Sequence, residues 1–145
     1  MVSLAFVRYF PVMPALLSLL LFDSRLRPAR IKLALLSYAG IIVIGSIPGA
    51  RAEVGEFAPG VVLHSLAYAG LTMLWFFGST GSARARAVKA VVAITLMGGA
   101  DELLQSFLPY RAGTVRDWIV DVSAALLTST VLALLIPRYE APRRG

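Results

Sequence analysis

Four long apolar runs constrain this chain more than any other feature of its sequence. They cover residues 31–48, 61–78, 88–108 and 117–137, and each is close to the ~20 residues that an α-helix needs to cross a bilayer. The whole chain of 145 residues is 58% hydrophobic, whereas a soluble domain is usually ~45–50% apolar. We therefore predict an all-α fold: a polytopic membrane helical bundle with four transmembrane helices, preceded by an apolar N-terminal segment.

The apolar N-terminal segment at residues 2–22 is long enough to span a bilayer. Arg8 and the proline pair Pro11 and Pro14 interrupt it, so we favour an uncleaved re-entrant or interfacial segment over a true span. It has neither the basic start nor the small-residue cleavage site of a signal peptide. The chain is then predicted to have three parts, an N-terminal segment with a basic linker, a four-helix transmembrane domain and a basic tail, at residues 1–30, 31–137 and 138–145.

Basic residues gather in three of the segments that flank the runs. Residues 23–32 hold four of the 14 Lys and Arg residues, and residues 79–89 and 138–145 hold three each. Basic residues near span ends stay on the cytoplasmic side, so four spans after residue 30 place all three segments inside. We predict a multi-pass protein of the cell membrane with cytoplasmic N- and C-termini and with loops 49–60 and 109–116 outside. Because topology accounts for most of the basic charge, no nucleic-acid partner is expected.

Polar residues within the apolar runs and in the loop before the last run form the candidate binding site. Ionisable groups in hydrocarbon cost at least a few kcal/mol each, so their presence needs a reason. Residues four apart share one helix face, and the predicted topology brings the polar ends of three spans to the outer leaflet. Nine side chains are expected to converge there: His64, Tyr68, Asp101, Glu102, Gln105, Arg111, Arg116, Asp117 and Asp121.

These polar residues also fit a purely structural network. Asp101 could pair with Arg111, and Asp117 with Arg116, while Gln105 bonds across helices. One histidine with several carboxylates could alternatively hold a divalent cation such as Mg²⁺ or Ca²⁺. The spacing matches no specific metal motif, so no metal site and no cofactor are predicted. The chain has no cysteine, which excludes disulfides and thiolate metal sites. Gly98, Gly99 and Ala100 are small enough to let another helix approach closely.

The stretch DELLQSFLPYRAGTVRDWIVDVSAALL resembles the signature of VanZ-like membrane proteins. That signature is roughly Asp-Glu-x-His-Gln, then Phe-x-Pro-x-Arg, then an Asp with an Asn four residues later. SIPG at 46–49 and LHSLAYAGL at 63–71 resemble the family's upstream elements. Leu104 stands where the family often has His, and Asp121 stands where it usually has Asn, which makes this site more acidic. The matching positions are Asp101, Glu102, Gln105, Phe107, Pro109, Arg111 and Asp117.

The resemblance implies a cell-envelope protein, because the family's namesake is linked to low-level resistance to the glycopeptide antibiotic teicoplanin. We expect an integral membrane protein that influences glycopeptide susceptibility through a polar outer-leaflet site. Its partners would be the lipid bilayer and a lipid-linked cell-wall precursor or a glycopeptide. One alternative is an intramembrane enzyme acting on a lipid-linked phosphate or sugar, with Asp101, Glu102 and His64 as catalytic candidates. Another is a transporter or proton relay. The sequence does not decide whether the protein is an enzyme, nor its oligomeric state.

Overall fold

The computed structural model of the chain describes residues 20–136. Within that range every regular element is a helix and no strand is present, which confirms the all-α prediction there. Most of the apolar segment predicted at residues 2–22 and the basic tail predicted at 138–145 lie outside the described residues.

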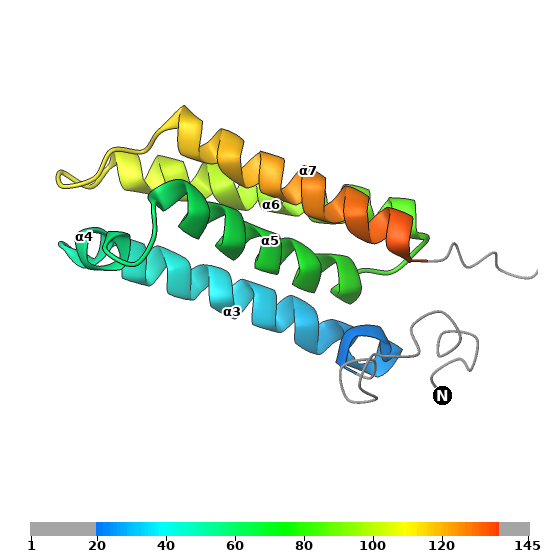
Figure 1. Cartoon of the computed structure of the whole chain (residues 1–145). Coiled ribbons are helices and arrows are strands. Elements are labelled where there is room, and N and C mark those ends of the chain that lie inside the picture. The colour runs from blue at the N-terminus through cyan, green and yellow to red at the C-terminus, as the bar shows by residue number, and fades with distance from the viewer. Residues whose placement is uncertain (1–19, 137–145) are drawn as a thin grey trace, which may run out of the picture.

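Four long helices run side by side along one axis, and a short helix sits at one end (Figure 1). In Figure 1, α5 lies between α3 on one side and the pair α6 and α7 on the other. The elements, in chain order, are the 3₁₀ helix η1 (Ser24–Leu26), α3 (Arg27–Gly45), α4 (Ala50–Gly55), α5 (Gly60–Gly78), α6 (Ala83–Ser106) and α7 (Val115–Leu135).

Three of the long helices are long and apolar enough to cross a membrane. These candidate spans are Ser24–Gly45, Gly60–Gly78 and Val115–Leu135, and they correspond to the first, second and fourth predicted spans. The helix of the third predicted span, α6, is the longest of the four. It carries more charge than the other three, at Arg84, Arg86, Lys89, Asp101 and Glu102. The count of four transmembrane helices therefore stays a prediction.

The first long helix begins earlier than the apolar run suggests, at Arg27 and not near residue 31. Arg30, which the sequence places in a linker, is 6% exposed. Its guanidinium donates to the carbonyl oxygens of Leu20, Asp23 and Phe77 at 2.8, 2.8 and 2.9 Å. Carbonyl acceptors satisfy the buried cation, so this basic residue ties the start of α3 to the end of α5.

The connection between the first two candidate spans is partly helical, whereas the sequence predicts a polar loop at residues 49–60. Gly49 adopts a φ of 86°, in the left-handed region that glycine tolerates. This turn redirects the chain after α3 and lets α4 form over Ala50–Gly55. The short helix lies at the end of the molecule where α5 begins (Figure 1).

The interior is small and is shared by all four long helices. Tyr68 and Leu71 of α5 pack with Ile94 of α6 and Ala125 of α7, and these side chains are at most 2% exposed. Alanines and glycines allow the close approach. A Cβ on Gly98 would lie 3.0 Å from Asp121 Oδ2 and 3.2 Å from Asp121 Cβ, so the α6 backbone packs directly against the Asp121 side chain of α7 there. This agrees with the small-residue prediction for α6.

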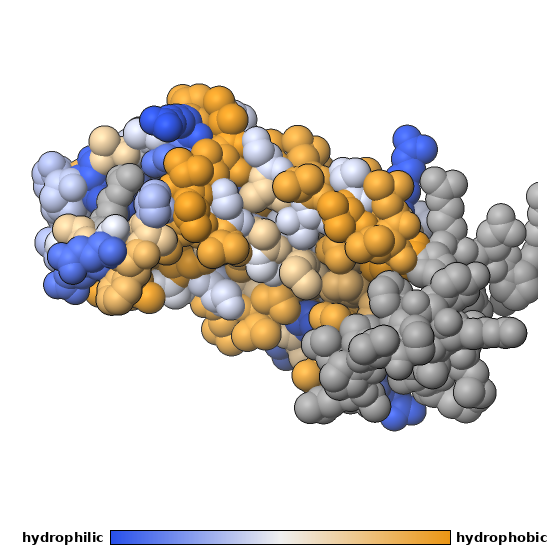
Figure 2. All heavy atoms as spheres, in the orientation of Figure 1, coloured by the Kyte–Doolittle hydropathy of each residue, from blue (hydrophilic) through white to orange (hydrophobic). Residues whose placement is uncertain are grey.

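The outer surface of the long helices is mostly apolar. Large side chains such as Leu36, Leu66, Leu96 and Leu127 are each 68–70% exposed. Figure 2 shows hydrophilic residues concentrated at the end that carries α4, with hydrophobic residues common along the helices. Water would penalise so large an apolar surface, whereas hydrocarbon does not.

Candidate functional site

The ends of three helices position the polar side chains that are predicted to converge. Helix α5 begins at Gly60 and α6 ends at Ser106, so His64 and Gln105 lie at the same end of the molecule. Helix α7 begins there too, after Thr114, whose hydroxyl oxygen accepts from the backbone N–H of Asp117 at 3.1 Å. This N-cap satisfies a free N–H of the first turn. In Figure 1 it is the end that also carries α4.

His64 and Asp121 form the first contact of the site. His64 Nδ1 lies 2.9 Å from Asp121 Oδ1, joining α5 to α7. The Asp121 side chain is fully buried and that of His64 is 18% exposed. The imidazole also stacks on the ring of Tyr68, with centroids 6.0 Å apart and an interplanar angle of 4°. These contacts hold the imidazole in one orientation.

Tyr68, Asp101 and Gln105 form the second contact. The Tyr68 hydroxyl donates to Asp101 Oδ2 at 3.0 Å, and the Gln105 amide donates to Asp101 Oδ1 at 2.9 Å. All three side chains are at most 4% exposed. Both carboxylate oxygens of Asp101 are therefore satisfied, and α5 is linked to α6. The face shared by residues 101 and 105 is the one that the four-residue spacing predicts.

Glu102 joins the end of α6 to the loop before α7. Its Oε2 accepts from the backbone N–H of Thr114 at 2.5 Å. The loop backbone lies directly on the helix, because a Cβ on Gly113 would be 2.0 Å from the Glu102 carbonyl oxygen. Only glycine fits that approach. Neither Gly113 nor Thr114 is among the site residues predicted from the sequence, although a Thr just before a helix start is a recognisable N-cap signal.

Trp118 also belongs to this arrangement and was not predicted as part of it. Its indole N–H donates to the Thr95 carbonyl at 3.0 Å, and its ring lies against Gly98 and Gly99. It thereby fixes the rotation of α7 on α6, which aims Asp121 toward His64.

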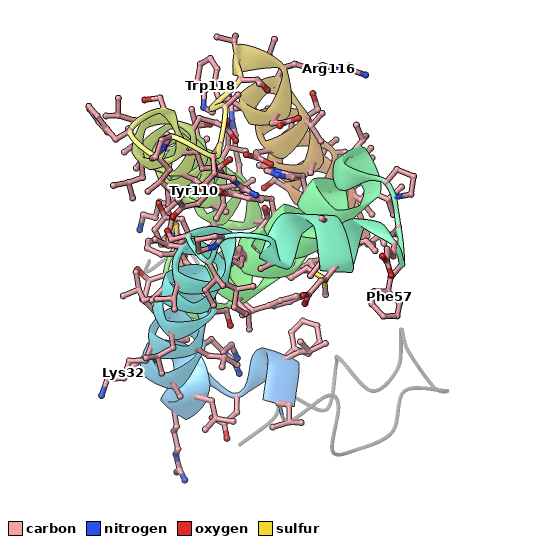
Figure 3. All side chains as sticks on the ribbon, turned by 90° about the vertical axis from the view of Figure 1, so that its left-hand side faces the viewer. Lys32, Phe57, Tyr110, Arg116 and Trp118 are labelled. Atoms are coloured by element: carbon pink, nitrogen blue, oxygen red, sulfur yellow. The ribbon has the colours of Figure 1, made fainter. Side chains whose placement is uncertain are left out.

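The two arginines of the predicted site behave differently. Arg111 lines a cavity together with His64 and Tyr68, whereas Arg116 is exposed and points away from the helices (Figure 3). Among the described residues, no ion pair joins Asp101 to Arg111, which one interpretation of the sequence allowed. Asp101 accepts from Tyr68 and Gln105 instead.

The cavity beside Arg111 has a volume of about 280 Å³. It lies between α3 and α5, next to α4, with Gly45, Val54 and Leu63 in its wall. A second, larger hollow of about 720 Å³ continues between α3 and α5 and is lined mainly by Leu, Ala and Phe side chains. Ile41 and Ala67 line both spaces. The two hollows therefore adjoin at these residues, one with polar groups in its wall and the other almost wholly apolar.

Several buried oxygens of the site have no hydrogen-bond partner in the described part of the chain. They are Glu102 Oε1, Gln105 Oε1 and Asp121 Oδ2. His64, Glu102 and Asp121 each offer one ligand atom, and these atoms lie within 4.8 Å of one another. The metal alternative, which the sequence spacing alone did not favour, thus has three residues from three helices in place.

Comparison with family models, with curated proteins and with solved structures finds no match for this chain. The resemblance to VanZ-like proteins therefore rests on the quoted sequence elements alone and stays a prediction. What the site can do has to be argued from its own chemistry.

Proposed function

We propose that this protein is an integral membrane protein with four transmembrane helices that binds a lipid carrying an anionic headgroup. The headgroup would occupy the cavity at Arg111, His64 and Tyr68, and the hydrocarbon chain would follow the apolar hollow between α3 and α5. A polyprenyl phosphate or a related lipid-linked cell-wall precursor has this chemistry. Such binding at the outer leaflet is one way in which a VanZ-like protein would influence glycopeptide susceptibility.

The observation that carries this proposal is that the two hollows adjoin. Ile41 and Ala67 line both the small cavity that contains Arg111 and the long apolar hollow. A headgroup cavity alone would suit any small anion, and an apolar hollow alone would suit any acyl chain. Together they favour an amphipathic ligand whose charged end and chain are covalently joined.

Charge supports an anionic headgroup. A guanidinium presents a fork of N–H donors that matches phosphate oxygens, and Arg111 Nε has no partner among the described residues. The Arg111 side chain lies close to the small residue Gly45, where an added Cβ would be 3.6 Å from one terminal nitrogen. The absence of a side chain at position 45 leaves room beside the guanidinium.

Binding of a polyprenyl phosphate to the purified full-length protein in nanodiscs tests the proposal. The matched probes are the neutral polyprenol of equal chain length and inorganic phosphate. We expect the phosphorylated lipid to bind at least tenfold more tightly than either probe. Arg111→Gln should lower that affinity by about ten- to one-hundredfold, because a hydrogen bond to a charged group contributes about 1.5–3 kcal/mol.

Two control variants separate the site from general effects. Arg116→Gln removes an exposed arginine of the first turn of α7 and should leave the affinity unchanged. Gly70→Leu would place a side chain in the apolar hollow, which Gly70 lines, whereas Gly40→Leu adds the same side chain where nothing lies within 4 Å and outside both hollows. Equal loss of binding in Arg111→Gln and Arg116→Gln, or in both leucine variants, would argue against the proposed site.

A second candidate function is an enzyme acting on the same class of lipid. The observation that favours it is the grouping of His64 with Glu102 and Asp121, two carboxylates and an imidazole next to the headgroup cavity. Such a group can transfer protons to and from a phosphate ester or an attacking water. Release of phosphate from the bound lipid, abolished by Glu102→Gln while lipid binding is kept, would support catalysis. Binding of the lipid without release of phosphate would contradict a catalytic role and would support a binding role only.

A further inference from the structure

Three side chains from three different helices meet within the polar cluster. His64 comes from the second turn of α5, Glu102 from the last turns of α6 and Asp121 from the second turn of α7. One ligand atom from each lies within 4.8 Å of the other two. Residues so far apart in sequence reach this spacing only through helix packing, and no local motif produces it.

The carboxylates in this group are incompletely satisfied. Asp121 is fully buried and Glu102 is 8% exposed. Asp121 Oδ2 and Glu102 Oε1 have no hydrogen-bond partner in the part of the chain that the structure describes. A buried carboxylate oxygen without a partner is costly. One cation between the two side chains would satisfy both oxygens and offset two negative charges.

We propose that His64, Glu102 and Asp121 bind a single divalent transition-metal ion, of the class of Mn²⁺ or Zn²⁺. The donor set is one imidazole nitrogen with two carboxylates. An imidazole favours a transition metal over Mg²⁺ or Ca²⁺, and the absence of thiolates disfavours the softest ions. The proposal does not depend on the lipid ligand, because the three residues form the site on their own.

The geometry needs only small adjustments to hold such an ion. Two ligand atoms of one tetrahedral Zn²⁺, with bonds of about 2.1 Å, lie about 3.4 Å apart. His64 Nδ1 and Asp121 Oδ1 are hydrogen-bonded at 2.9 Å, so the ion would take the place of the shared proton and part the two atoms by about 0.5 Å. The unpartnered Oδ2 belongs to the same Asp121 carboxylate. Glu102, the third ligand, lies on a long side chain that can approach them by a change of its terminal torsions.

Neighbouring contacts would hold the ligands in place. Thr114 N–H donates to Glu102 Oε2 at 2.5 Å, and the Tyr68 ring stacks on His64. The Asp101 carboxylate accepts hydrogen bonds from Tyr68 and Gln105. Asp101 is therefore a buried neighbour of the site and not one of its metal ligands. Such supporting partners commonly change metal affinity by about ten- to one-hundredfold when they are removed.

Electron paramagnetic resonance of Mn²⁺ tests the proposal on the full-length protein in detergent. The protein is stripped with a chelator and titrated with Mn²⁺ alone, and the loss of the free-ion signal measures binding. We expect one Mn²⁺ per chain, displaced by an equivalent of Zn²⁺, which binds such ligands more tightly. Because the chain has a single histidine, a ¹⁴N coupling to the bound Mn²⁺ identifies His64 without any substitution, provided that the purification tag contains no histidine.

Substitutions provide the second measurement. Glu102→Gln and Asp121→Asn should each weaken Mn²⁺ binding by at least tenfold, whereas Glu56→Gln, an exposed carboxylate of the α4 region, should leave it unchanged. If a ligand variant does not fold, the Mn²⁺ stoichiometry and the ¹⁴N coupling of the wild-type protein still test the proposed site. Absence of stoichiometric binding, absence of nitrogen coupling, or equal binding by Glu102→Gln and wild type would overturn the site. Lipid is absent throughout, so failure here leaves the proposed lipid binding untouched.

Discussion

His64 Nδ1 lies 2.9 Å from Asp121 Oδ1, and this contact joins two helices whose residues are 57 positions apart in the chain. The aspartate is fully buried, so the contact is shielded from bulk water on that side. Around it, the second pair of Tyr68 and Asp101 links α5 to α6. The polar cluster therefore connects three helices at one end of the molecule, and its contribution to stability can be measured separately from any ligand.

A double-mutant cycle should reveal the His64–Asp121 contact. We expect the substitutions His64→Ala and Asp121→Ala to be non-additive, with a coupling energy of about 0.5–3 kcal/mol in the free energy of unfolding. The measurement is unfolding by SDS in mixed micelles with a chelator present. A cycle of His64→Ala with Ser129→Ala is the control, since Ser129 lies about 12 Å further along α7 at 1.5 Å per residue. Additivity in the first cycle would show that the contact contributes no net coupling.

Removal of the Tyr68 hydroxyl should lower the free energy of unfolding more than removal of the Tyr110 hydroxyl. Tyr68→Phe leaves Asp101 Oδ2 without its donor in a buried environment, so we expect a loss of about 1–3 kcal/mol in the free energy of unfolding. Tyr110 is 47% exposed and donates to the Ser46 carbonyl at 2.6 Å, where water can replace it. Tyr110→Phe should therefore cost well under half as much. Equal losses in the two variants would contradict the importance of burial for this bond.

Gly113→Ala should disrupt the loop that precedes α7. The new Cβ would lie 2.0 Å from the Glu102 carbonyl oxygen, a backbone atom, so the loop or the helix end has to move. We expect a loss of at least about 1–3 kcal/mol, as for other overpacked sites. The measurement is the thermal unfolding of helix in detergent by circular dichroism. Gly55→Ala, where nothing lies within 4 Å of the added atom, should change the melting temperature little.

Cysteine labelling should place the polar cluster on the outer side of the membrane. The chain has no cysteine, so single replacements can be labelled in intact cells with a membrane-impermeant thiol reagent. We expect Ala112→Cys and Glu56→Cys to react and Thr80→Cys to be protected, because the basic segment at residues 79–89 favours the cytoplasmic side. All three residues are exposed in the structure. The reverse pattern would place the headgroup cavity in the cytoplasmic leaflet.

Much of the candidate site follows from the sequence because helical periodicity is local. Residues four apart, such as Asp101 and Gln105, share a face in any α-helix. Because consecutive helices run in opposite directions, their polar ends lie at the same end of the molecule. For these reasons the sequence predicts that His64, Tyr68 and Asp121 lie near one another. Helical periodicity does not predict the position of Arg116. This residue lies in the predicted stretch of chain, but its side chain is exposed and points away from the helices.

Helix boundaries were less predictable where a polar residue is buried by tertiary contacts. Arg30 reads as part of a basic linker, yet its guanidinium donates to three carbonyls and lies inside the start of α3. Residues 50–55 read as loop, yet they form a helix after the turn at Gly49. For Arg30 the deciding contacts join segments that sequence patterning treats separately, whereas for residues 50–55 the local glycine turn decides.

Sequence patterning was enough to predict the helical class of the described residues, the three candidate membrane spans among the four that it predicts, and the placement of the polar residues at one end of the helices. Periodicity and apolar length are local properties that the chain carries without its tertiary structure. Helix packing, in contrast, selects which polar atoms meet: His64 with Asp121, Asp101 with Tyr68, and Glu102 with the loop at Gly113 and Thr114. These choices depend on the rotation and close approach of neighbouring helices, which Gly98 and Trp118 set at the contact of α6 with α7.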